Sequence, residues 1–297
     1  MNTLIFGDVH GEAKALADLL SFTREVVGPD APLEIYSVGD LIDRGPDSKG
    51  VIDLCIQHGV RNLLGNHELW LHEWITTGKV NSKIPLSSAM GGAATLRSYG
   101  IDPEQRVARV DPVSGSEILH VSSRWLEKEL DRVVPQEHRE YIANGELWAE
   151  VVHGDTTYFL SHGGIPKEAG TAIWNDPVVA TLRNSVPNPN PATNRYFAGM
   201  LYETLSKVAP QQILWVGAKK GKVFRLPEGC VQVFGHTPWG TSEYREDHYV
   251  ALDTGCGTSP PHRLTGLLLR EDGRVNRVQQ TTLPTGRASL SPWDDTL

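Results

Sequence analysis

Five short strings, each directly after a run of apolar and β-branched residues, constrain the fold of this chain more than any other feature. The strings are Gly7–His10, Gly39–Gly45, Gly65–Glu68, Ser161–Gly164 and Gly235–Pro238. The runs before them are Thr3–Phe6, Leu33–Val38, Arg61–Leu64, Thr157–Leu160 and Val231–Phe234. Such runs predict β-strands, and a glycine at a strand end leaves room for the next side chain at the mouth of the sheet. Asp, His and Asn side chains from five strand ends can therefore converge on one point.

The segments between the first three predicted strands have a helical pattern. Apolar residues recur at helical spacing over residues 12–27: Leu16, Leu19, Leu20 and Val26. Ser48 is expected to cap a second helix, and Gly59 is expected to end it. Strand, helix, strand, helix, strand implies right-handed crossovers and a mostly parallel first sheet. Sheets of this kind bind ligands at the carboxyl ends of their strands.

The rest of the chain is less regular, and nothing in it resembles a linker, so one domain over residues 1–297 is expected. The pattern predicts a mostly helical stretch over 69–145, a hairpin around 153–155, an irregular excursion over 184–198, hairpins over 231–269 and a loose tail over 289–297.

Composition narrows the class of protein. Apolar residues make up 39% of the chain, enough for a sizeable core. No apolar run reaches the length of about 18 residues that a membrane span needs. The first residues lack the basic stretch and long apolar core of a secretory signal. Cys55, Cys230 and Cys256 are too few and too scattered for a disulfide framework, and none lies in a CxxC pair. The cytoplasm is the expected compartment.

The formal charge of −8 argues against general binding to a nucleic-acid backbone, which needs a basic face. A small anionic substrate remains compatible with this charge. The basic residues Lys219, Lys220, Lys222 and Arg225 form one cluster, which we interpret as a solvated loop rather than a substrate contact.

The order GDVHG, GDLIDRG, GNHE, SHGG and GHTP resembles the calcineurin-like metallophosphoesterase superfamily, and within it the phosphoprotein phosphatase branch. The string Leu252–Gly257 resembles the same branch, and the likeness extends from about Leu4 to about Leu269. It implies an α/β fold in which two mixed β-sheets form a sandwich flanked by helices. A dinuclear metal site is then expected at the strand ends.

The resemblance also implies a ligand set for two divalent ions. Asp8 and His10 would bind the first ion, Asp40 would bridge both, and the second would be held by Asn66, His162 and His236. Imidazole and carboxylate without thiolate suit Mn²⁺, Fe or Zn²⁺. Manganese is the first choice for the isolated enzyme, with Fe, Zn, Ni or Co as alternatives.

Three residues are expected to act on the substrate. His67 follows a ligand directly and is interpreted as the general acid that protonates the leaving oxygen. By resemblance, Asp43 is its carboxylate partner, and Arg44 is the arginine that contacts the phosphoryl group. Arg44, Asn66 and His67 together are expected to bind the substrate.

At two positions this chain lacks an arginine that protein phosphatases or bacterial relatives usually carry. Leu64 stands where protein phosphatases usually carry Arg, and this leucine resembles the symmetrical diadenosine tetraphosphatases. Glu68 and the pair Asp43 with Arg44 resemble the protein phosphatases instead. Gly217 stands where many bacterial relatives have a second phosphate-binding Arg. Candidates to replace the missing arginines are Lys219, Lys220, Arg225 and Arg97, the last of which follows the string Met90–Leu96.

Three hypotheses of function follow. The first is a phosphatase that hydrolyses phosphomonoesters, phosphoproteins among them, with a metal-activated hydroxide. The second is a hydrolase that cuts a dinucleoside tetraphosphate symmetrically. The third is a metal-loaded binding module without turnover. The partner is accordingly a phosphorylated small molecule, a phosphoprotein or a dinucleoside polyphosphate; neither a membrane nor a nucleic acid is expected.

Overall fold

A computed structural model describes residues 1–103, 108–110, 117–119, 121–186, 190–217, 219, 222–239, 243–245, 249–258, 263–281 and 288–292. In this part of the chain no helix is long and apolar enough to cross a membrane. All three cysteines are free and buried.

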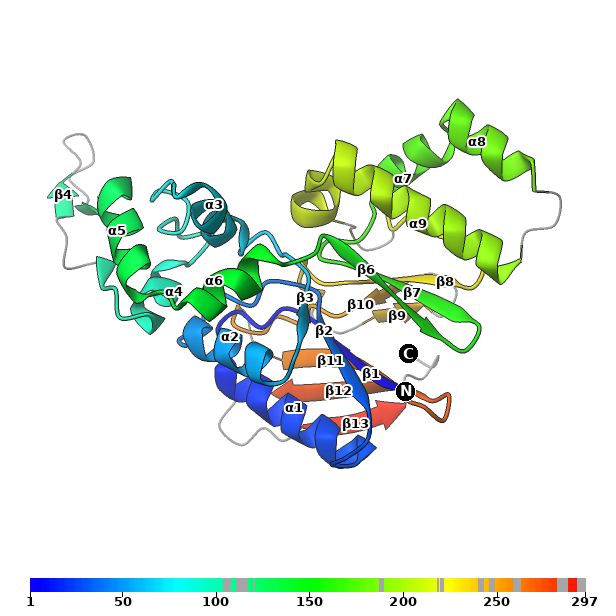
Figure 1. The fold of residues 1–297 in the computed structure, drawn as a ribbon, viewed down its shortest axis with the longest axis horizontal. Helices are drawn as coiled ribbons and strands as arrows, with labels where there is room; N and C mark the ends of the chain where they lie inside the picture. The colour runs from blue at the N-terminus through cyan, green and yellow to red at the C-terminus, as the bar shows by residue number, and fades with distance from the viewer. Residues whose placement is uncertain are drawn as a thin grey trace.

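Two mixed sheets form the centre of the molecule (Figure 1). In spatial order the six-stranded sheet contains β13 (Ser289–Pro292), β12 (Val275–Thr281), β11 (Arg263–Leu269), β1 (Asn2–Phe6), β2 (Leu33–Ser37) and β3 (Arg61–Asn62). The five-stranded sheet contains β6 (Trp148–His153), β7 (Thr156–Ser161), β8 (Cys230–Phe234), β10 (Tyr249–Ala251) and β9 (Glu243–Arg245). The strands β1, β2 and β3 run parallel, as do β7, β8 and β10, and every other pairing within the two sheets is antiparallel. The predicted sandwich of mixed sheets is confirmed.

Side chains that alternate along each strand explain how the six-stranded sheet packs against helices on one face and against the other sheet on the opposite face. Leu4 and Phe6 of β1 belong to the core that packs against the helices, whereas Ile5 between them belongs to the core shared with the five-stranded sheet. Successive side chains of a strand point to opposite faces, so a strand between two layers is buried on both faces. β1 is accordingly buried at every position.

Helices cover both sheets and extend beyond them. Helix α1 (Ala13–Val27) contacts β11 and β12, and it packs against α2 (Ser48–Gln57). The five-stranded sheet is covered by α9 (Pro191–Val208), which contacts β6, β7 and β8. Figure 1 shows two groups of helices that extend from opposite sides of the sheets. One contains α3 (Leu69–Thr77), α4 (Ala93–Ser98), α5 (Ser123–Val133), α6 (Gln136–Ala143) and the strands β4 (Ala108–Val110) and β5 (Glu117–Leu119); the other contains α7 (Lys167–Trp174), α8 (Pro177–Asn184) and α9.

Three local predictions were wrong. Asp47, not Ser48, caps α2, because the Asp47 carboxylate accepts a hydrogen bond from Gly50 N at 2.8 Å. The predicted irregular excursion over 184–198 contains the start of α9, which Asn190 caps just before Pro191; Asn followed by Pro favours a helix start. Residues 187–189 of that stretch lie outside the described part. The expected loose tail begins instead as β13, paired with β12, while residues 293–297 are not described.

Candidate active site

The carboxyl ends of the two sets of parallel strands meet at one edge of the sandwich. Asp8 and His10 follow β1, and Asp40 follows β2. From the second sheet, His162 follows β7 and His236 follows β8. The structure therefore brings side chains from both sheets together, as the sequence predicts for strand ends.

One group of acceptor atoms surrounds the amide oxygen of Asn66. His236 Nδ1 lies 2.8 Å from Asn66 Oδ1, and His162 Nε2 lies 3.0 Å from the same oxygen. The two imidazole nitrogens are 3.1 Å apart, and Asp40 Oδ1 lies 3.3 Å from His162 Nε2. Four ligand-type atoms thus face a common point.

Backbone carbonyls fix the orientation of both imidazole rings. His162 Nδ1 donates to Val38 O at 2.9 Å, and His236 Nε2 donates to Trp215 O at 2.9 Å. In a neutral ring the other nitrogen then carries a lone pair. Both lone pairs face each other and the oxygens of Asn66 and Asp40, an arrangement that only a shared cation or proton stabilises. Metal-binding histidines are held by such outer hydrogen bonds, so this donor set fits a divalent ion.

A second group lies on the other side of the Asp40 carboxylate. His10 Nε2 is 3.6 Å from Asp40 Oδ2 and 4.0 Å from Asp8 Oδ2. His10 Nδ1 donates to Ile42 O at 3.0 Å, which again directs the other nitrogen inward. Arg44 Nη1 donates to that nitrogen at 2.5 Å. Since one Asp40 oxygen faces each group, its carboxylate has the geometry of a bridge.

Three buried carboxyl groups lie at this edge. Asp8, Asp40 and Asp253 are all buried. Burial, with Asp253 and Asp40 nearby, raises the pKa of Asp8 well above its ordinary value. Burial, opposed by the Gly255 amide and reinforced by Asp40, raises the pKa of Asp253 to about 6. Carboxylates that are costly to ionise in the absence of cations are the groups that bound cations stabilise.

The same edge contains all the non-glycine residues of the described chain that have left-handed φ angles: His10 (47°), Asp40 (54°), Asp43 (72°), Arg44 (67°) and His236 (70°). This conformation costs about 1–3 kcal/mol for a residue with a side chain. Strained residues of this kind cluster at active sites, and all five are predicted site residues.

Two glycines of the strings allow the loops to approach closely. A Cβ atom on Gly65 would lie 2.2 Å from Asp40 Oδ1, and one on Gly235 would lie 2.0 Å from Asp8 Oδ1. Any larger residue would displace these carboxylates. The glycines are therefore required by contact with the site, and not only by chain direction.

His67 and Asp43 form a buried pair beside the two groups of ligand-type atoms. His67 Nδ1 lies 2.9 Å from Asp43 Oδ2, and His67 Nε2 lies 3.9 Å from Asp40 Oδ2. Burial lowers the pKa of His67, but the carboxylates of Asp40 and Asp43 outweigh it and hold the pKa above the ordinary value. Trp70 Nε1, at 3.3 Å, and Thr95 Oγ1, at 2.8 Å, also donate to Asp43.

The sequence did not assign a role to Glu68. Its buried carboxylate accepts four backbone N–H groups, those of Asp40 (2.9 Å), Gly65 (2.8 Å), Leu41 (2.8 Å) and Ile42 (3.2 Å). These groups belong to the loops after β2 and β3, so Glu68 ties the two loops together. One feature of the sequence could have indicated this role: Glu68 directly follows two predicted site residues, Asn66 and His67, whereas glutamates are usually exposed to solvent.

The structure shows what surrounds the two positions, 64 and 217, where relatives carry an arginine. Leu64 is 4% exposed and packs beside Gly145, whose Cβ would lie 2.6 Å from Leu64 Cδ2. A Cβ on Gly217 would lie 2.8 Å from His236 Cδ2. Of the candidate replacements, Arg97, Lys219 and Arg225 are exposed, and Lys220 lies outside the described residues.

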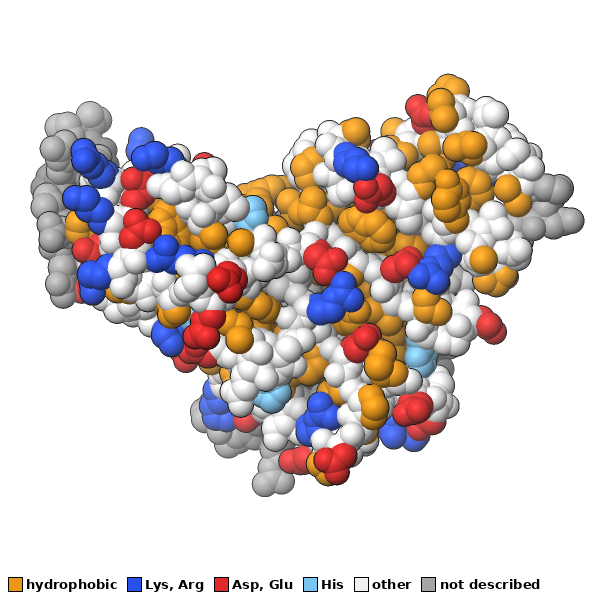
Figure 2. Space-filling view, in the orientation of Figure 1, with side chains coloured by type: hydrophobic (Ala, Val, Ile, Leu, Met, Phe, Trp, Pro, Cys, Tyr) orange, Lys and Arg blue, Asp and Glu red, His pale blue; other side chains and the backbone are white. Residues whose placement is uncertain are grey.

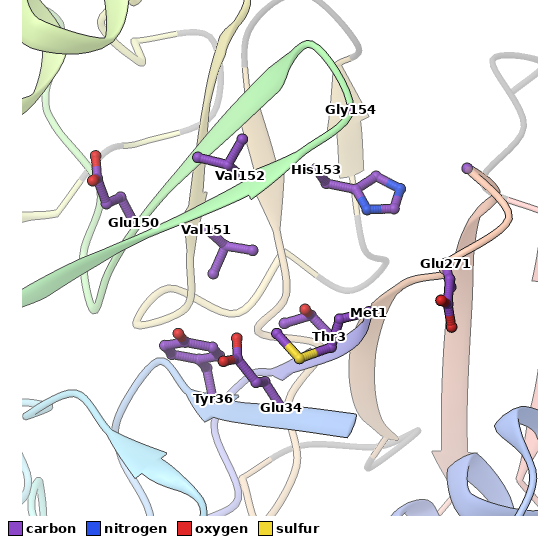
Figure 3. A pocket seen from close by; sticks show the side chains of 11 residues that line it. Met1, Thr3, Glu34, Tyr36, Glu150, Val151, Val152, His153, Gly154 and Glu271 are labelled. Carbon is purple, nitrogen blue, oxygen red and sulfur yellow. The ribbon is translucent and has the colours of Figure 1, made fainter. Parts of the chain in front are cut away.

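A separate cavity of 350 Å³ lies away from the cluster (Figure 3). Met1 and Thr3 line it at the amino end of β1, opposite the carboxyl end from which Asp8 and His10 follow. The other lining residues include Glu34, Tyr36, Glu271 and the turn around His153, and none of the lining residues is a predicted site residue. The cavity and the candidate active site are thus different places in the fold.

The sequence of this chain is similar to those of known phosphoesterases. Residues 1–253 match the family model described as calcineurin-like phosphoesterase. A symmetrical bis(5'-nucleosyl)-tetraphosphatase of Edwardsiella ictaluri is 42% identical over 274 residues, which cover 86% of this chain and 89% of that protein. Serine/threonine-protein phosphatase 2 of Escherichia coli is 39% identical over 77 residues, 26% of this chain and 34% of that protein. A crystal structure titled as a putative diadenosine tetraphosphatase aligns over 99% of this chain and 94% of its own, with 18% identity and a TM-score of 0.46.

The match over residues 1–253 and the relative that covers most of the chain place this protein in the calcineurin-like phosphoesterase family. It is a phosphoric ester hydrolase, and the family implies divalent metal ions. Two groups of ligand-type residues share Asp40: His10, Asp40 and His67, and Asp40, His162 and His236.

Proposed function

We propose that the protein is a dinuclear, manganese-dependent phosphatase that hydrolyses phosphomonoesters, phosphoproteins among them. The observation that carries the proposal is the Asp40 carboxylate, whose oxygens face two groups of ligand atoms. Asp8 and His10 would hold the first ion, and Asn66, His162 and His236 the second. When bound, the two ions would neutralise phosphoryl charge and supply the nucleophile.

The residues of this chain supply the remaining steps. Arg44 would donate hydrogen bonds to the phosphoryl oxygens, and its present partner, His10 Nε2, would then be free to act as a ligand. Asn66, as well as holding the second ion, is proposed to contact the substrate. His67 Nε2 would protonate the leaving oxygen, while Asp43 keeps the proton of Nδ1 in place.

The buried acid pair favours phosphomonoesters of alcohols. An alkoxide leaving group needs a proton, whereas a nucleoside diphosphate leaves readily without one. The burial of Asp43 and its hydrogen bonds from His67, Trp70 and Thr95 support a role of His67 as a proton donor, which an anhydride would hardly use. The same pair argues against a binding module without turnover, because binding alone gives a positioned acid no role.

A second candidate function is symmetrical hydrolysis of a dinucleoside tetraphosphate. It is favoured by the 42%-identical tetraphosphatase and by the leucine at position 64. A common substrate panel tests both readings. Metal-reconstituted protein is given phosphoserine and phosphothreonine peptides, p-nitrophenyl phosphate and diadenosine tetraphosphate, and products are separated by chromatography.

Phosphate release from the peptides with a kcat/KM above that for diadenosine tetraphosphate supports the first reading. Conversion of diadenosine tetraphosphate to ADP alone, at the higher kcat/KM, would establish the second. No turnover of any substrate with Mn²⁺, Ni²⁺, Co²⁺ or Zn²⁺ would contradict both.

We also infer one cytoplasmic domain. The proposed site draws its residues from Asp8 to His236, so most of the chain is needed to assemble it. Three buried, free cysteines agree with a reducing compartment. Figure 2 shows acidic and basic side chains interspersed on the face in view, as expected for a protein that does not bind a nucleic-acid backbone.

A further inference from the structure

The segment Gly91–Thr95 lies against the loop after β2, about fifty residues earlier in the chain, and its contacts are not accounted for by the chemistry above. Thr95 Oγ1 accepts a hydrogen bond from Asp43 N at 2.8 Å and donates to Asp43 Oδ1 at 2.8 Å. Its hydroxyl is also 2.9 Å from Ser48 Oγ, which lies 3.1 Å from Asp43 N. All three side chains are buried, and this small polar network therefore holds Asp43 at both its backbone and its carboxylate.

The other end of the segment holds the next residue. Gly91 O accepts the backbone N–H of Arg44 at 3.1 Å. Gly91 has a φ angle of 73°, and a Cβ placed on it would lie 3.0 Å from Arg44 Cγ and 3.2 Å from Arg44 Cα. The side chain of Arg44 thus passes directly over Gly91, and a side chain at position 91 would crowd it.

Both contacted residues are strained. Asp43 and Arg44 have consecutive left-handed φ angles of 72° and 67°. Such a pair persists only where the surroundings determine it, because each residue would relax to a negative φ if released. Thr95 and Gly91 each receive one of the two N–H groups, so one short segment fixes both strained residues.

We propose that Thr95 and Gly91 are positioning residues of the active site. Thr95 orients the Asp43 carboxylate toward His67, and Gly91 orients Arg44 toward the phosphoryl group. The Asp43 oxygen that Thr95 binds is not the one that His67 binds, so Thr95 prevents the carboxylate from rotating away from the imidazole. The inference rests on the proposed roles of His67 and Arg44.

The first test removes the Thr95 hydroxyl and keeps its shape. Thr95→Val is compared with Thr95→Ser, which keeps the hydroxyl, on an alkyl phosphate and on p-nitrophenyl phosphate. Loss of an outer hydrogen-bond partner at a metal site typically costs about 10- to 100-fold in metal affinity or activity. We expect Thr95→Val to lower kcat about tenfold on the alkyl ester and less on the aryl ester, with metal content unchanged. Thr95→Ser should recover most of the activity.

A matched control is available in α1. Thr23 is buried, and its hydroxyl donates to Leu19 O of the same helix at 2.8 Å rather than to a proposed site residue. Thr23→Val makes the same chemical change and should leave the ratio of alkyl to aryl rates unaltered. An equal loss on both esters in Thr95→Val would overturn the proposal. Should Thr95→Val not fold, Thr95→Ala gives the same comparison.

A double-mutant cycle with His67→Asn separates positioning from general stability. If Thr95 acts through Asp43 and His67, Thr95→Val should change kcat less than about twofold once His67 is Asn. Effects that simply multiply would refute the assignment. Failure of the proposed acid is seen separately, as equal losses on alkyl and aryl esters in His67→Asn alone.

Gly91→Ala tests the other contact. The added methyl group should displace Arg44 and raise KM for p-nitrophenyl phosphate, and the inhibition constant for inorganic phosphate, by about threefold to tenfold, with kcat less affected. Gly100→Ala is the control, since Gly100 also has a positive φ but nothing within 4 Å of its Cβ position. Unchanged KM and phosphate inhibition in folded Gly91→Ala would overturn the role of Gly91.

Discussion

His67 Nδ1 lies 2.9 Å from Asp43 Oδ2, and both side chains are buried. Nδ1 binds the Asp43 carboxylate and keeps its proton. Nε2 faces the predicted metal ligands and lies 3.9 Å from Asp40 Oδ2. The two nitrogens therefore differ in role: one is fixed by Asp43, and the other is available to a substrate or an ion.

This arrangement predicts the behaviour of His67→Asn. Folding and metal content should stay near wild type, while kcat on an alkyl phosphate should fall by roughly 10²–10⁴, the usual contribution of general acid catalysis. The loss should be smaller for p-nitrophenyl phosphate, whose leaving group hardly needs a proton. His58→Asn, at an exposed position, is the control. Equal losses on both esters would mean that His67 positions substrate or binds metal instead.

Arg44→Ala should mainly weaken interaction with the phosphoryl group. Loss of one charge-assisted contact costs about 1.5–3 kcal/mol, which is about 10- to 150-fold in kcat/KM. Arg44→Lys should recover only part of this, because an ammonium group cannot make the bidentate contact. Steady-state kinetics with elemental analysis checks both, and Arg132→Ala, an exposed arginine of α5, is the control. A fall in bound metal equal to the fall in activity would contradict the assignment.

Asp40→Ala should be the most damaging change among the proposed ligands. It removes the carboxylate that faces both groups of ligand atoms, so two cations would lie close together without a shared anion. We expect loss of both ions and of nearly all activity, measured by elemental analysis after exhaustive dialysis. Two retained metals per chain would rule out the bridge.

The ends of the strands could be predicted from the sequence because the physical signal is local. An apolar run followed by glycine and a polar ligand marks where a strand stops, and five such places have to meet once the strands form two packed sheets. The residues that hold Asp43 could not be predicted in this way. Thr95 lies in a helix of the α3–α6 group, and nothing in its neighbours in sequence indicates which loop it will touch.

Leu64 illustrates a second limit. The sequence indicates that an arginine is missing there, but not that the position is buried against Gly145, where no guanidinium could be added without displacing the strand end. Ser48 was predicted as a helix cap from its residue type. In the structure its hydroxyl contacts Asp43 N, because Asp47 already caps the helix. A tertiary contact decided the case of Leu64, whereas a local helix cap decided that of Ser48.

Glu68→Gln should destabilise the loops that carry the proposed ligands. One carboxylate oxygen becomes an NH₂ group that faces backbone N–H donors, so at least one hydrogen bond to a charged group is lost and a donor is left unpaired. We expect the free energy of unfolding to fall by about 2–4 kcal/mol and metal affinity to fall with it. Urea denaturation and metal titration measure both. Glu34→Gln, an exposed glutamate of β2, should change neither, and an unaltered Glu68→Gln protein would exclude the clamping role.

Metal binding should depend on pH because His162 must lose a proton first. Burial lowers the pKa of His162, but Asp40, Asp8 and Glu68 outweigh it and raise the pKa to about 10 in the metal-free protein. Burial and the neighbouring His162 lower the pKa of His236 to about 4, so His236 is already neutral near pH 7. Since the pKa of His162 lies above the working range, each fall of one pH unit makes proton competition about tenfold stronger.

The dissociation constant for Mn²⁺ should therefore rise about tenfold for each unit that the pH falls between about 8 and about 6. Calorimetric titrations in buffers of different ionisation enthalpy should detect at least one proton released as the ions bind. Asp53, Glu137 and His138 form another group of ligand-type residues, so the titration is repeated with Glu137→Gln to exclude binding there. A dissociation constant that stays constant over this pH range, in both proteins, would show that His162 is not protonated before the metal binds.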